Sequence, residues 1–130
     1  MGNKQLLVMI DDDSDEHEIF KMAVDDLHQS LNTLFFYDCE SAIEHFSQST
    51  AVAPGYVFMD FRLPRIDGDS CLQELQRLKQ FDEPLLVIFS SSLPGDWREK
   101  LLNVGADEFL EKTSSIELLS QRIANLIETS

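Results

Sequence analysis

Hydrophobic residues follow two patterns along the chain. Short unbroken runs, such as Tyr56 to Met59, are typical of buried strands, and residues that recur every three or four positions are typical of amphipathic helices. The runs predict strands at about residues 5–10, 33–37, 56–59, 85–89 and 108–111. The helical pattern predicts a helix that starts near residue 14, further helices over about 41–48, 68–79 and 96–103, and a last helix that carries Ile116 to Ile127.

Strand and helix therefore alternate five times, which predicts an α/β fold with a doubly wound, five-stranded parallel sheet and five helices on its two faces. The continuous hydrophobic run at 85–89 fits a strand that is buried on both faces. With 130 residues and 43% hydrophobic content, the chain fits one globular domain. We expect that domain to span residues 1–130, without a second, output domain.

The chain is strongly acidic, with 24 Asp and Glu against 10 Lys and Arg and a formal net charge of −14. That balance argues against binding to nucleic acid or anionic membranes and favours cations and basic partner surfaces. No signal peptide and no hydrophobic stretch of about 20 residues is visible, so we expect a cytoplasmic protein that does not enter the membrane. Cys39 and Cys71 lack metal-ligand spacing, and we expect both to be reduced.

Polar residues follow four of the predicted strands at the point where each strand ends. In chain order, these residues are Asp11 and Asp12, Asp60, Ser90 and Lys112. The carboxyl ends of parallel strands lie at one edge of a sheet, and ligands of open α/β sheets bind at that edge. We therefore expect these side chains to form one site.

The types of residue at this edge predict phosphoryl chemistry. The carboxylates of Asp11, Asp12 and Asp60 would repel one another unless a cation lay among them, and Mg²⁺ suits a few carboxylates completed by water and a phosphate oxygen. An Asp in such a site can attack a phosphoryl group and form an aspartyl phosphate. Lys112 would offset charge on the phosphoryl oxygens, and Ser90 would donate a hydrogen bond to one of them.

Four motifs together resemble the receiver domain of the two-component response-regulator family, in its stand-alone, chemotaxis-regulator-like form. They are the acid pair Asp11-Asp12, the Asp-x-x-x-Pro-x-x-Asp-Gly signature at Asp60, Pro64, Asp67 and Gly68, the hydroxyl of Ser90, and the Gly-Ala-x-x-aromatic-x-x-Lys segment at Gly105, Ala106, Phe109 and Lys112. The resemblance covers the whole chain and implies the flavodoxin-like strand order 2-1-3-4-5.

The resemblance also implies a role for each site residue. Asp60 would accept the phosphoryl group, and Asp12, Asp60 and the backbone carbonyl of Arg62 would bind Mg²⁺ directly. Phe109 would turn inward when Ser90 closes on the phosphoryl group. The donor would be a phosphohistidine on a sensor histidine kinase or a histidine phosphotransfer protein. An output protein would bind the face of the fourth helix, fifth strand and fifth helix on a monomer or weak homodimer.

Two residues depart from the family's pattern. Thr113 stands where a proline usually follows the lysine in a cis peptide bond, and a cis bond costs about 2.5–4 kcal/mol before a non-proline residue. The Lys112–Thr113 bond is therefore either strained and cis, or trans with a different approach of the lysine, and trans is favoured. Ser91 replaces a small apolar residue, so it forms a row of hydroxyls with Ser90 and Ser92, of which we prefer Ser90 as the group that contacts the phosphoryl.

Three functions fit these residues. The first is a phosphorylation-switched signalling module whose only chemistry is the gain and loss of a phosphoryl group on Asp60, so that it is not an enzyme for other substrates. The second is a small haloacid-dehalogenase-like phosphatase, since an Asp-x-Asp pair, Asp11 and Asp13, follows the first strand. The third is a docking module with a receiver-like fold that works without phosphorylation, an alternative that Thr113 keeps open.

The other acids and the histidines have simpler explanations. We expect a solvated helix start, capped by Ser14, for Asp13, Asp15, Glu16 and Glu18. We expect positions at or near the surface, without a metal, for His17, His28 and His45.

Overall fold

The computed structural model describes residues 3–60, 68–90, 99, 102–103 and 105–129. Its strands are β1 (Asn3–Ile10), β2 (Asn32–Phe36), β3 (Pro54–Asp60), β4 (Leu85–Ser90) and β5 (Glu108–Glu111). Its helices are α1 (Ser14–Asp25), α2 (Cys39–Phe46), α3 (Gly68–Arg77), the short 3-10 helix η1 (Lys79–Phe81) and α5 (Ile116–Thr129). The strands pair in parallel in the order β2-β1-β3-β4-β5, which confirms the predicted doubly wound sheet.

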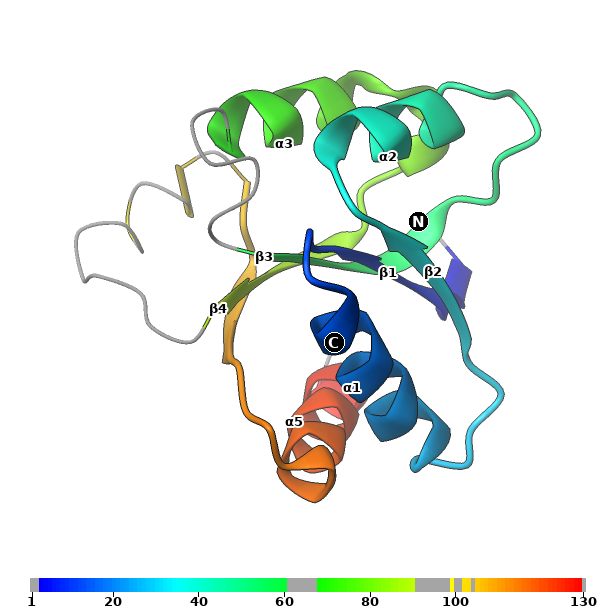
Figure 1. The fold of residues 1–130 in the computed structure, drawn as a ribbon. Coiled ribbons are helices and arrows are strands. Elements are labelled where there is room, and N and C mark those ends of the chain that lie inside the picture. Colours follow the sequence, from blue (N-terminus) through cyan, green and yellow to red (C-terminus); the bar gives the residue numbers. More distant parts are fainter. Residues whose placement is uncertain (1–2, 61–67, 91–98, 100–101, 104, 130) are drawn as a thin grey trace.

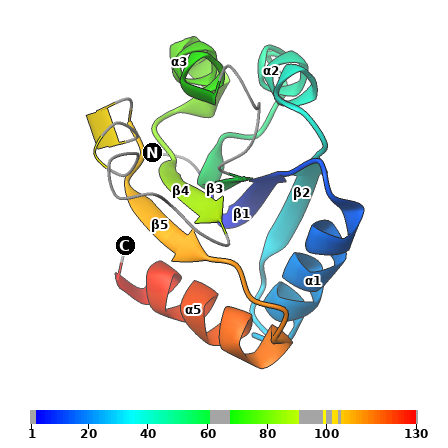
Figure 2. The same cartoon turned by 60° about the vertical axis from the view of Figure 1, so that its left-hand side comes forward.

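The helices lie in two layers, one on each face of the sheet. Helices α2 and α3 cover one face, and α1 and α5 cover the other (Figures 1 and 2). Of the helix expected at 96–103, Glu99, Leu102 and Asn103 are helical, and its other residues lie outside the described part of the chain. Because all five strands run in the same direction, their carboxyl ends lie at one edge of the sheet.

The interior strand β1 contributes to two hydrophobic layers. Leu6, Val8 and Ile10 belong to the layer under α2 and α3, whereas Leu7 and Met9 belong to the layer under α1 and α5. This division follows from the strand period of two, which turns successive side chains to opposite faces. Both sets are buried, as the hydrophobic run predicts for a strand in the middle of a covered sheet.

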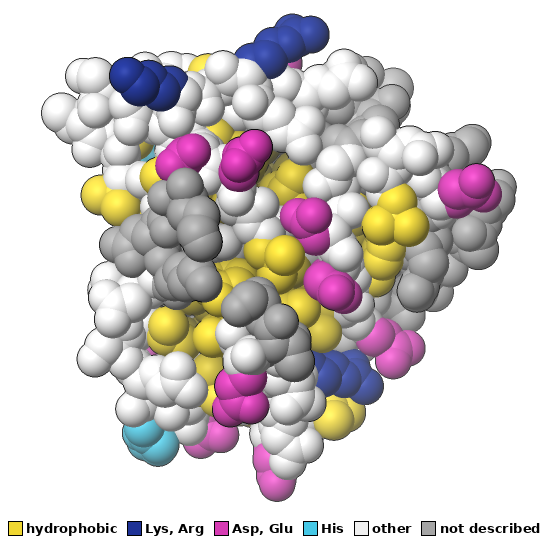
Figure 3. Space-filling model, turned by 180° about the vertical axis from the view of Figure 1, so that it is seen from behind, with side chains coloured by type: hydrophobic (Ala, Val, Ile, Leu, Met, Phe, Trp, Pro, Cys, Tyr) yellow, Lys and Arg dark blue, Asp and Glu magenta, His cyan; other side chains and the backbone are white. Residues whose placement is uncertain are grey.

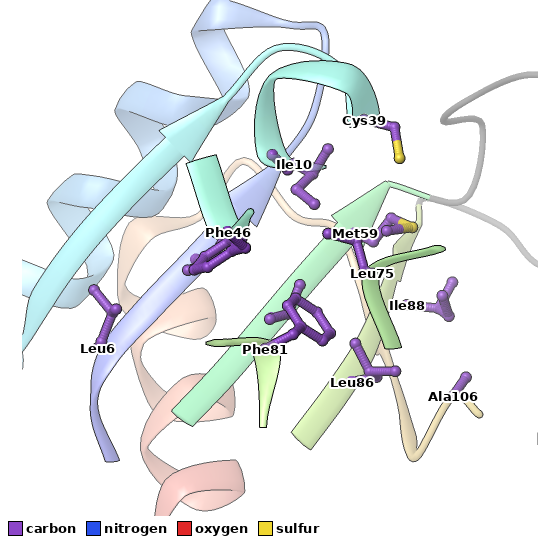
Figure 4. Packing of buried hydrophobic residues seen from close by; sticks show 13 residues of the cluster. Leu6, Ile10, Cys39, Phe46, Met59, Leu75, Phe81, Leu86, Ile88 and Ala106 are labelled. Atoms are coloured by element: carbon purple, nitrogen blue, oxygen red, sulfur yellow. The ribbon is translucent and has the colours of Figure 1, made fainter. Parts of the chain in front are cut away.

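Aromatic rings fill the space between the sheet and the helices on both faces. Under α2 and α3, the rings of Phe46 and Phe81 lie 5.5 Å apart, centroid to centroid (Figure 4). Under α1, the ring of Phe20 lies 4.8 Å from that of Phe58. All four rings are fully buried or nearly so, and edge-to-face pairs of this kind add to the stabilisation that burial provides.

Strand β3 and helix α2 each begin two residues earlier than the sequence pattern predicts. Strand β3 begins at Pro54. Proline lacks an N–H, but it is tolerated at the first residue of a strand. Helix α2 begins at Cys39, because the carboxylate of Asp38 accepts a hydrogen bond from the backbone N–H of Ser41 at 2.7 Å and so caps the helix.

Cys39, at the start of α2, is buried and disulfide-bonded. The expectation that this cysteine is reduced was therefore wrong. The spacing argument considered only neighbours along the sequence, whereas a disulfide depends on which elements meet in three dimensions. The side chain of Cys71, the second cysteine of the sequence, lies outside the described side chains.

Negative charge is spread over the surface as well as concentrated at the strand ends. Figure 3 shows acidic side chains distributed around a group of hydrophobic side chains near the centre of one face. Among the residues that the structure describes, no helix has the length and hydrophobicity that a membrane span requires.

Candidate functional site

Two buried carboxylates lie next to each other at the carboxyl edge of the sheet. Ile10 of β1 pairs with Met59 of β3, so the residues that follow, Asp11 and Asp60, extend from adjacent strands. Asp11 is fully buried and Asp60 is 2% exposed. Because the two residues occupy matching positions in the strand alternation, their side chains turn to the same face of the sheet.

Lys112, directly after β5, bridges the two carboxylates. Its Nζ lies 3.0 Å from Oδ2 of Asp11 and 3.1 Å from Oδ1 of Asp60. The ammonium group also lies 5.5 Å from the centroid of the Phe89 ring, within range of a cation–π attraction. The backbone N–H of Lys112 donates to the carbonyl of Ser90 at 2.8 Å, so the β4–β5 pairing continues to the lysine and sets its position.

Burial and the contacts between Lys112 and the acids shift the pKa values of Asp11 and Lys112 in opposite directions. Burial raises the pKa of Asp11, and hydrogen bonds from Lys112 and from the N–H of Asp13 oppose the shift. Burial acts to lower the pKa of Lys112, but the hydrogen bond to Asp11 and the charge of Asp60 outweigh it, so this pKa is raised. The lysine therefore stays charged at neutral pH, and Asp11 takes up a proton more readily than a free aspartic acid.

Asp12 completes a group of three carboxylates. One oxygen atom from each of Asp11, Asp12 and Asp60 lies within 4.8 Å of the others. Asp12 is exposed, so a cation could enter the group from its side. A hard divalent ion such as Mg²⁺ prefers oxygen ligands and keeps some of its waters, and this donor set therefore fits it.

The turn between β1 and α1 is held by hydrogen bonds from its own residues. The N–H of Asp13 donates to Oδ1 of Asp11 at 3.0 Å, and Oδ1 of Asp13 accepts from the N–H of Asp15 at 2.9 Å. Asp13 is therefore the N-cap of α1, and the prediction that Ser14 caps it was wrong, because Asp13 has the extended backbone that a cap requires. Its capping role also weakens the case for Asp13 as the second acid of a phosphatase-like pair.

Two residues of α1 are more buried than the sequence predicted. His17 was expected near the surface, but it is buried, and its Nε2 lies 2.7 Å from the carbonyl oxygen of Asp11. A signal was present, because His17 precedes Phe20 by three positions and so shares the inner face of the helix. Glu16 is half-buried rather than solvated, and burial raises its pKa, with the charge of Lys112 opposing the shift.

The other predicted site residues are only partly described. Ser90 ends β4 and is half-buried. Phe109 of β5 is also half-buried and packs against the hydrophobic layer under α2 and α3. Arg62, Ser91 and Ser92 lie outside the described residues. The roles of Ser90 and Phe109 therefore stay predictions.

Hydroxyl groups hold the turn that follows Lys112, where the family's pattern has proline. Oγ1 of Thr113 accepts from the N–H of Ser115 at 3.1 Å, and Oγ of Ser115 accepts from the N–H of Leu118 at 3.1 Å as α5 begins. Side-chain acceptors of this kind favour turns and helix starts. They offer an alternative to a proline ring for ordering this turn, and the isomer of the Lys112–Thr113 bond stays a prediction.

The sheet order and the acid–lysine bridge at its carboxyl edge together define a receiver-type domain. The family model for the response regulator receiver domain matches residues 7–124. The chain belongs to this family, whose members are the receivers of two-component signalling. This match confirms the resemblance that the four sequence motifs indicated.

Relatives of the chain are longer proteins. It is 23% identical over 126 residues to hybrid signal transduction histidine kinase D of Dictyostelium discoideum, a match that covers 96% of this chain and 8% of the relative. It is 28% identical over 131 residues to the transcriptional regulatory protein TrcR of Mycobacterium tuberculosis, covering 99% of this chain and 48% of the relative. The chain thus spans less than half the length of these two relatives.

Solved structures share the fold. Response regulator RPA3017 of R. palustris superposes with a TM-score of 0.81 at 17% identity, covering 96% of this chain and 92% of that one. The receiver domain of sensor histidine kinase PA1611 of Pseudomonas aeruginosa PAO1 superposes with a TM-score of 0.72 at 20% identity, covering 95% and 98%. The second of these structures has a magnesium ion in its active-site cleft.

Proposed function

We propose that this chain is the receiver of a two-component phosphorelay and that Asp60 accepts a phosphoryl group from a phosphohistidine. The observation that carries the proposal is the bridge in which Nζ of Lys112 lies 3.1 Å from Asp60 and 3.0 Å from Asp11. It places a buried carboxylate and a fixed cation at one point, where the charge of a transferring phosphoryl group would need stabilising. Membership of the receiver family supports the same assignment.

Transfer of the phosphoryl group breaks one bond in the phosphohistidine and forms one bond to Asp60. An oxygen of the Asp60 carboxylate attacks phosphorus, and the bond between phosphorus and the imidazole nitrogen breaks. The electron pair of that bond stays on the nitrogen, which takes up a proton, so the products are an aspartyl phosphate and a neutral histidine. Lys112 then pairs with a phosphoryl oxygen, because the new group brings a charge of about −1.5 to −2.

Three carboxylates would hold Mg²⁺ in this site, namely those of Asp11, Asp12 and Asp60. When bound, the ion supplies positive charge next to the phosphoryl oxygens. The magnesium ion in the PA1611 receiver supports the choice of metal. The predicted ligand from the carbonyl of Arg62 lies outside the described residues. Ser90 would donate its hydroxyl hydrogen to a phosphoryl oxygen, and Phe109 would follow it inward.

The signal would leave the domain by protein contact or by onward phosphotransfer. A sensor histidine kinase or a histidine phosphotransfer protein would supply the phosphoryl group, and the hybrid histidine kinase among the relatives supports this donor. An output protein would bind the face formed by the fourth helix, β5 and α5. We further propose a cytoplasmic regulator, a monomer or weak homodimer, that catalyses only the gain and loss of its own phosphoryl group.

The proposal is tested with acetyl phosphate and Mg²⁺, followed by intact-mass spectrometry. The wild type should gain one phosphoryl group, and Asp60→Asn should gain none. Asp25→Asn is the matched control, because Asp25 is an exposed acid of α1, and it should react like the wild type. Equal labelling of Asp60→Asn and the wild type would contradict the proposal. Hydrolysis of small phosphate esters that needs Asp11 but not Asp60 would instead support a phosphatase.

A further inference from the structure

A buried histidine donates a hydrogen bond to the backbone of the acid pair. His17 of α1 is 6% exposed, and its Nε2 lies 2.7 Å from the carbonyl oxygen of Asp11. A carbonyl oxygen can only accept, so Nε2 carries a hydrogen and donates it. The imidazole ring packs against Phe35 and Tyr37, with centroids 5.0 and 4.4 Å away. These contacts hold the donor in a fixed place.

The carbonyl that accepts from His17 belongs to the peptide group that joins Asp11 to Asp12. A peptide group is planar, so the direction of this carbonyl also sets the point and direction from which Asp12 begins. Asp11 and Asp60 are buried against Lys112, whereas Asp12 is exposed. The direction of the Asp11–Asp12 peptide is one of the factors that set where the Asp12 carboxylate lies.

Other hydrogen bonds hold the parts of the turn on either side of this carbonyl. The N–H of Asp11 donates to the carbonyl of Phe36 at 3.0 Å, and Oδ1 of Asp11 accepts from the N–H of Asp13 at 3.0 Å. These two bonds restrain the start of Asp11 and its side chain, and the bond from His17 restrains the carbonyl between Asp11 and Asp12. Removal of groups that hold metal ligands in position typically lowers metal affinity by about 10–100-fold.

We propose that His17 is a positioning residue that orients the Asp11–Asp12 peptide for Mg²⁺ binding, an inference that rests on the metal site of the proposed function. His17 acts through Asp12 and contacts neither the ion nor the phosphoryl group. A histidine that only packed would contribute to stability through its ring and would leave Mg²⁺ affinity unchanged. The two roles therefore differ in whether loss of the N–H donor lowers the affinity for Mg²⁺.

Isothermal titration calorimetry with Mg²⁺ separates these roles. His17→Phe keeps a ring against Phe35 and Tyr37 but lacks the donor, and we expect its Mg²⁺ affinity to fall by about 10–100-fold. His17→Gln keeps an N–H donor without the ring, and it should recover most of the wild-type affinity. His45→Phe is the control, because His45 is a half-buried histidine of α2 with its ring 5.4 Å from Phe36, and its affinity should match the wild type.

Denaturant unfolding of each variant shows which proteins are folded. If His17→Phe does not fold, His17→Met replaces it, and it should bind Mg²⁺ more weakly than His17→Gln. Three results would overturn the inference. The first is an unchanged Mg²⁺ affinity in His17→Phe or His17→Met, which lack the N–H donor. The others are a weakened affinity in His17→Gln alone and a wild type that binds no Mg²⁺. The calorimetry contains no phosphoryl donor, so it tests Mg²⁺ binding separately from phosphorylation. A wild type that binds Mg²⁺ in the calorimeter but gains no phosphoryl group from acetyl phosphate would contradict the proposed function. It would leave the role of His17 intact.

Discussion

The faces of the sheet and its carboxyl edge are both buried, but they bury different chemistry. On the faces, side chains such as Phe20 and Phe46 are removed from water among other hydrophobic groups. At the edge, Asp11 and Asp60 are buried to a similar degree, with the ammonium group of Lys112 against both. Removal from water is favourable for the first set, whereas for the second it carries a desolvation penalty that the ion pairs must offset.

This difference separates the part of the molecule that maintains the fold from the part that can respond. Hydrophobic burial on the faces depends little on pH or on small ions. At the edge, one positive charge faces two buried negative charges and the exposed Asp12, so a proton or a divalent cation changes the balance directly. The same imbalance that makes the edge a poor source of stability makes it suited to binding a metal and a phosphoryl group.

A change on the faces should give a large loss of stability that does not depend on Mg²⁺. Phe20→Ala removes a fully buried ring from the layer under α1 and α5, and it should lower the free energy of unfolding by about 3–5 kcal/mol. Urea unfolding measures this loss, which should be the same with and without Mg²⁺. Leu118→Ala is the control, because Leu118 is 38% exposed, and its effect should stay within about 0.5 kcal/mol.

Removal of the cation at the edge should give a loss that Mg²⁺ partly reverses. Lys112→Met leaves Asp11 and Asp60 buried without their ammonium partner, and breaking a buried pair in this way typically lowers stability by about 3–5 kcal/mol. Urea unfolding with and without Mg²⁺ checks the reversal. Lys21→Met is the control, since Lys21 and Asp25 form an exposed pair, and it should change stability by less than about 0.5 kcal/mol. A loss for Lys112→Met that ignores Mg²⁺ would remove the distinction between edge and faces.

The edge should also respond to pH. Burial raises the pKa of Asp11, so its carboxyl binds a proton more tightly in the folded chain than in the unfolded chain. As pH falls through this raised pKa, protonation of Asp11 should therefore stabilise the metal-free fold. Mg²⁺ affinity should fall over the same range, by about tenfold per pH unit, because a protonated carboxyl is a poor ligand. Calorimetry across a pH series measures this slope, and Asp11→Asn should flatten it.

The smallest expected effect on stability comes from Asp38, a carboxylate away from the site. Asp38→Ala removes the N-cap of α2 and should lower stability by about 1 kcal/mol. Hydrogen bonds from the hydroxyl and N–H of Ser41 lower the pKa of Asp38, so its contribution is present above the unfolded pKa and is lost as pH falls through the folded one. Thermal unfolding from neutral to acid pH checks the direction, which is opposite to that of Asp11. Asp38→Asn should keep most of the cap without this pH dependence.

Sequence patterns predicted the layers of the fold and the groups at its edge because both depend on local order. Hydrophobic runs and the helical repeat located the five strands and the helices of the described chain, and the residue after each strand indicated which groups share an edge. The sequence patterns did not predict which side chain accepts a hydrogen bond from a nearby backbone N–H. Asp13 rather than Ser14 caps α1. Thr113 and Ser115 accept hydrogen bonds in the turn after Lys112, and no sequence pattern had indicated these bonds.

The sequence by itself determined the strand order implied by the family motifs, the hydrophobic character of both faces, and the identity of Asp11, Asp12, Asp60 and Lys112 as one group. Only the tertiary structure showed that Lys112 lies against both buried acids, that Cys39 is disulfide-bonded and that His17 donates to the carbonyl of Asp11. The reason is physical. Period and motif are properties of the order of residues along the chain, whereas these contacts depend on which atoms the folded backbone brings within about 3 Å of each other.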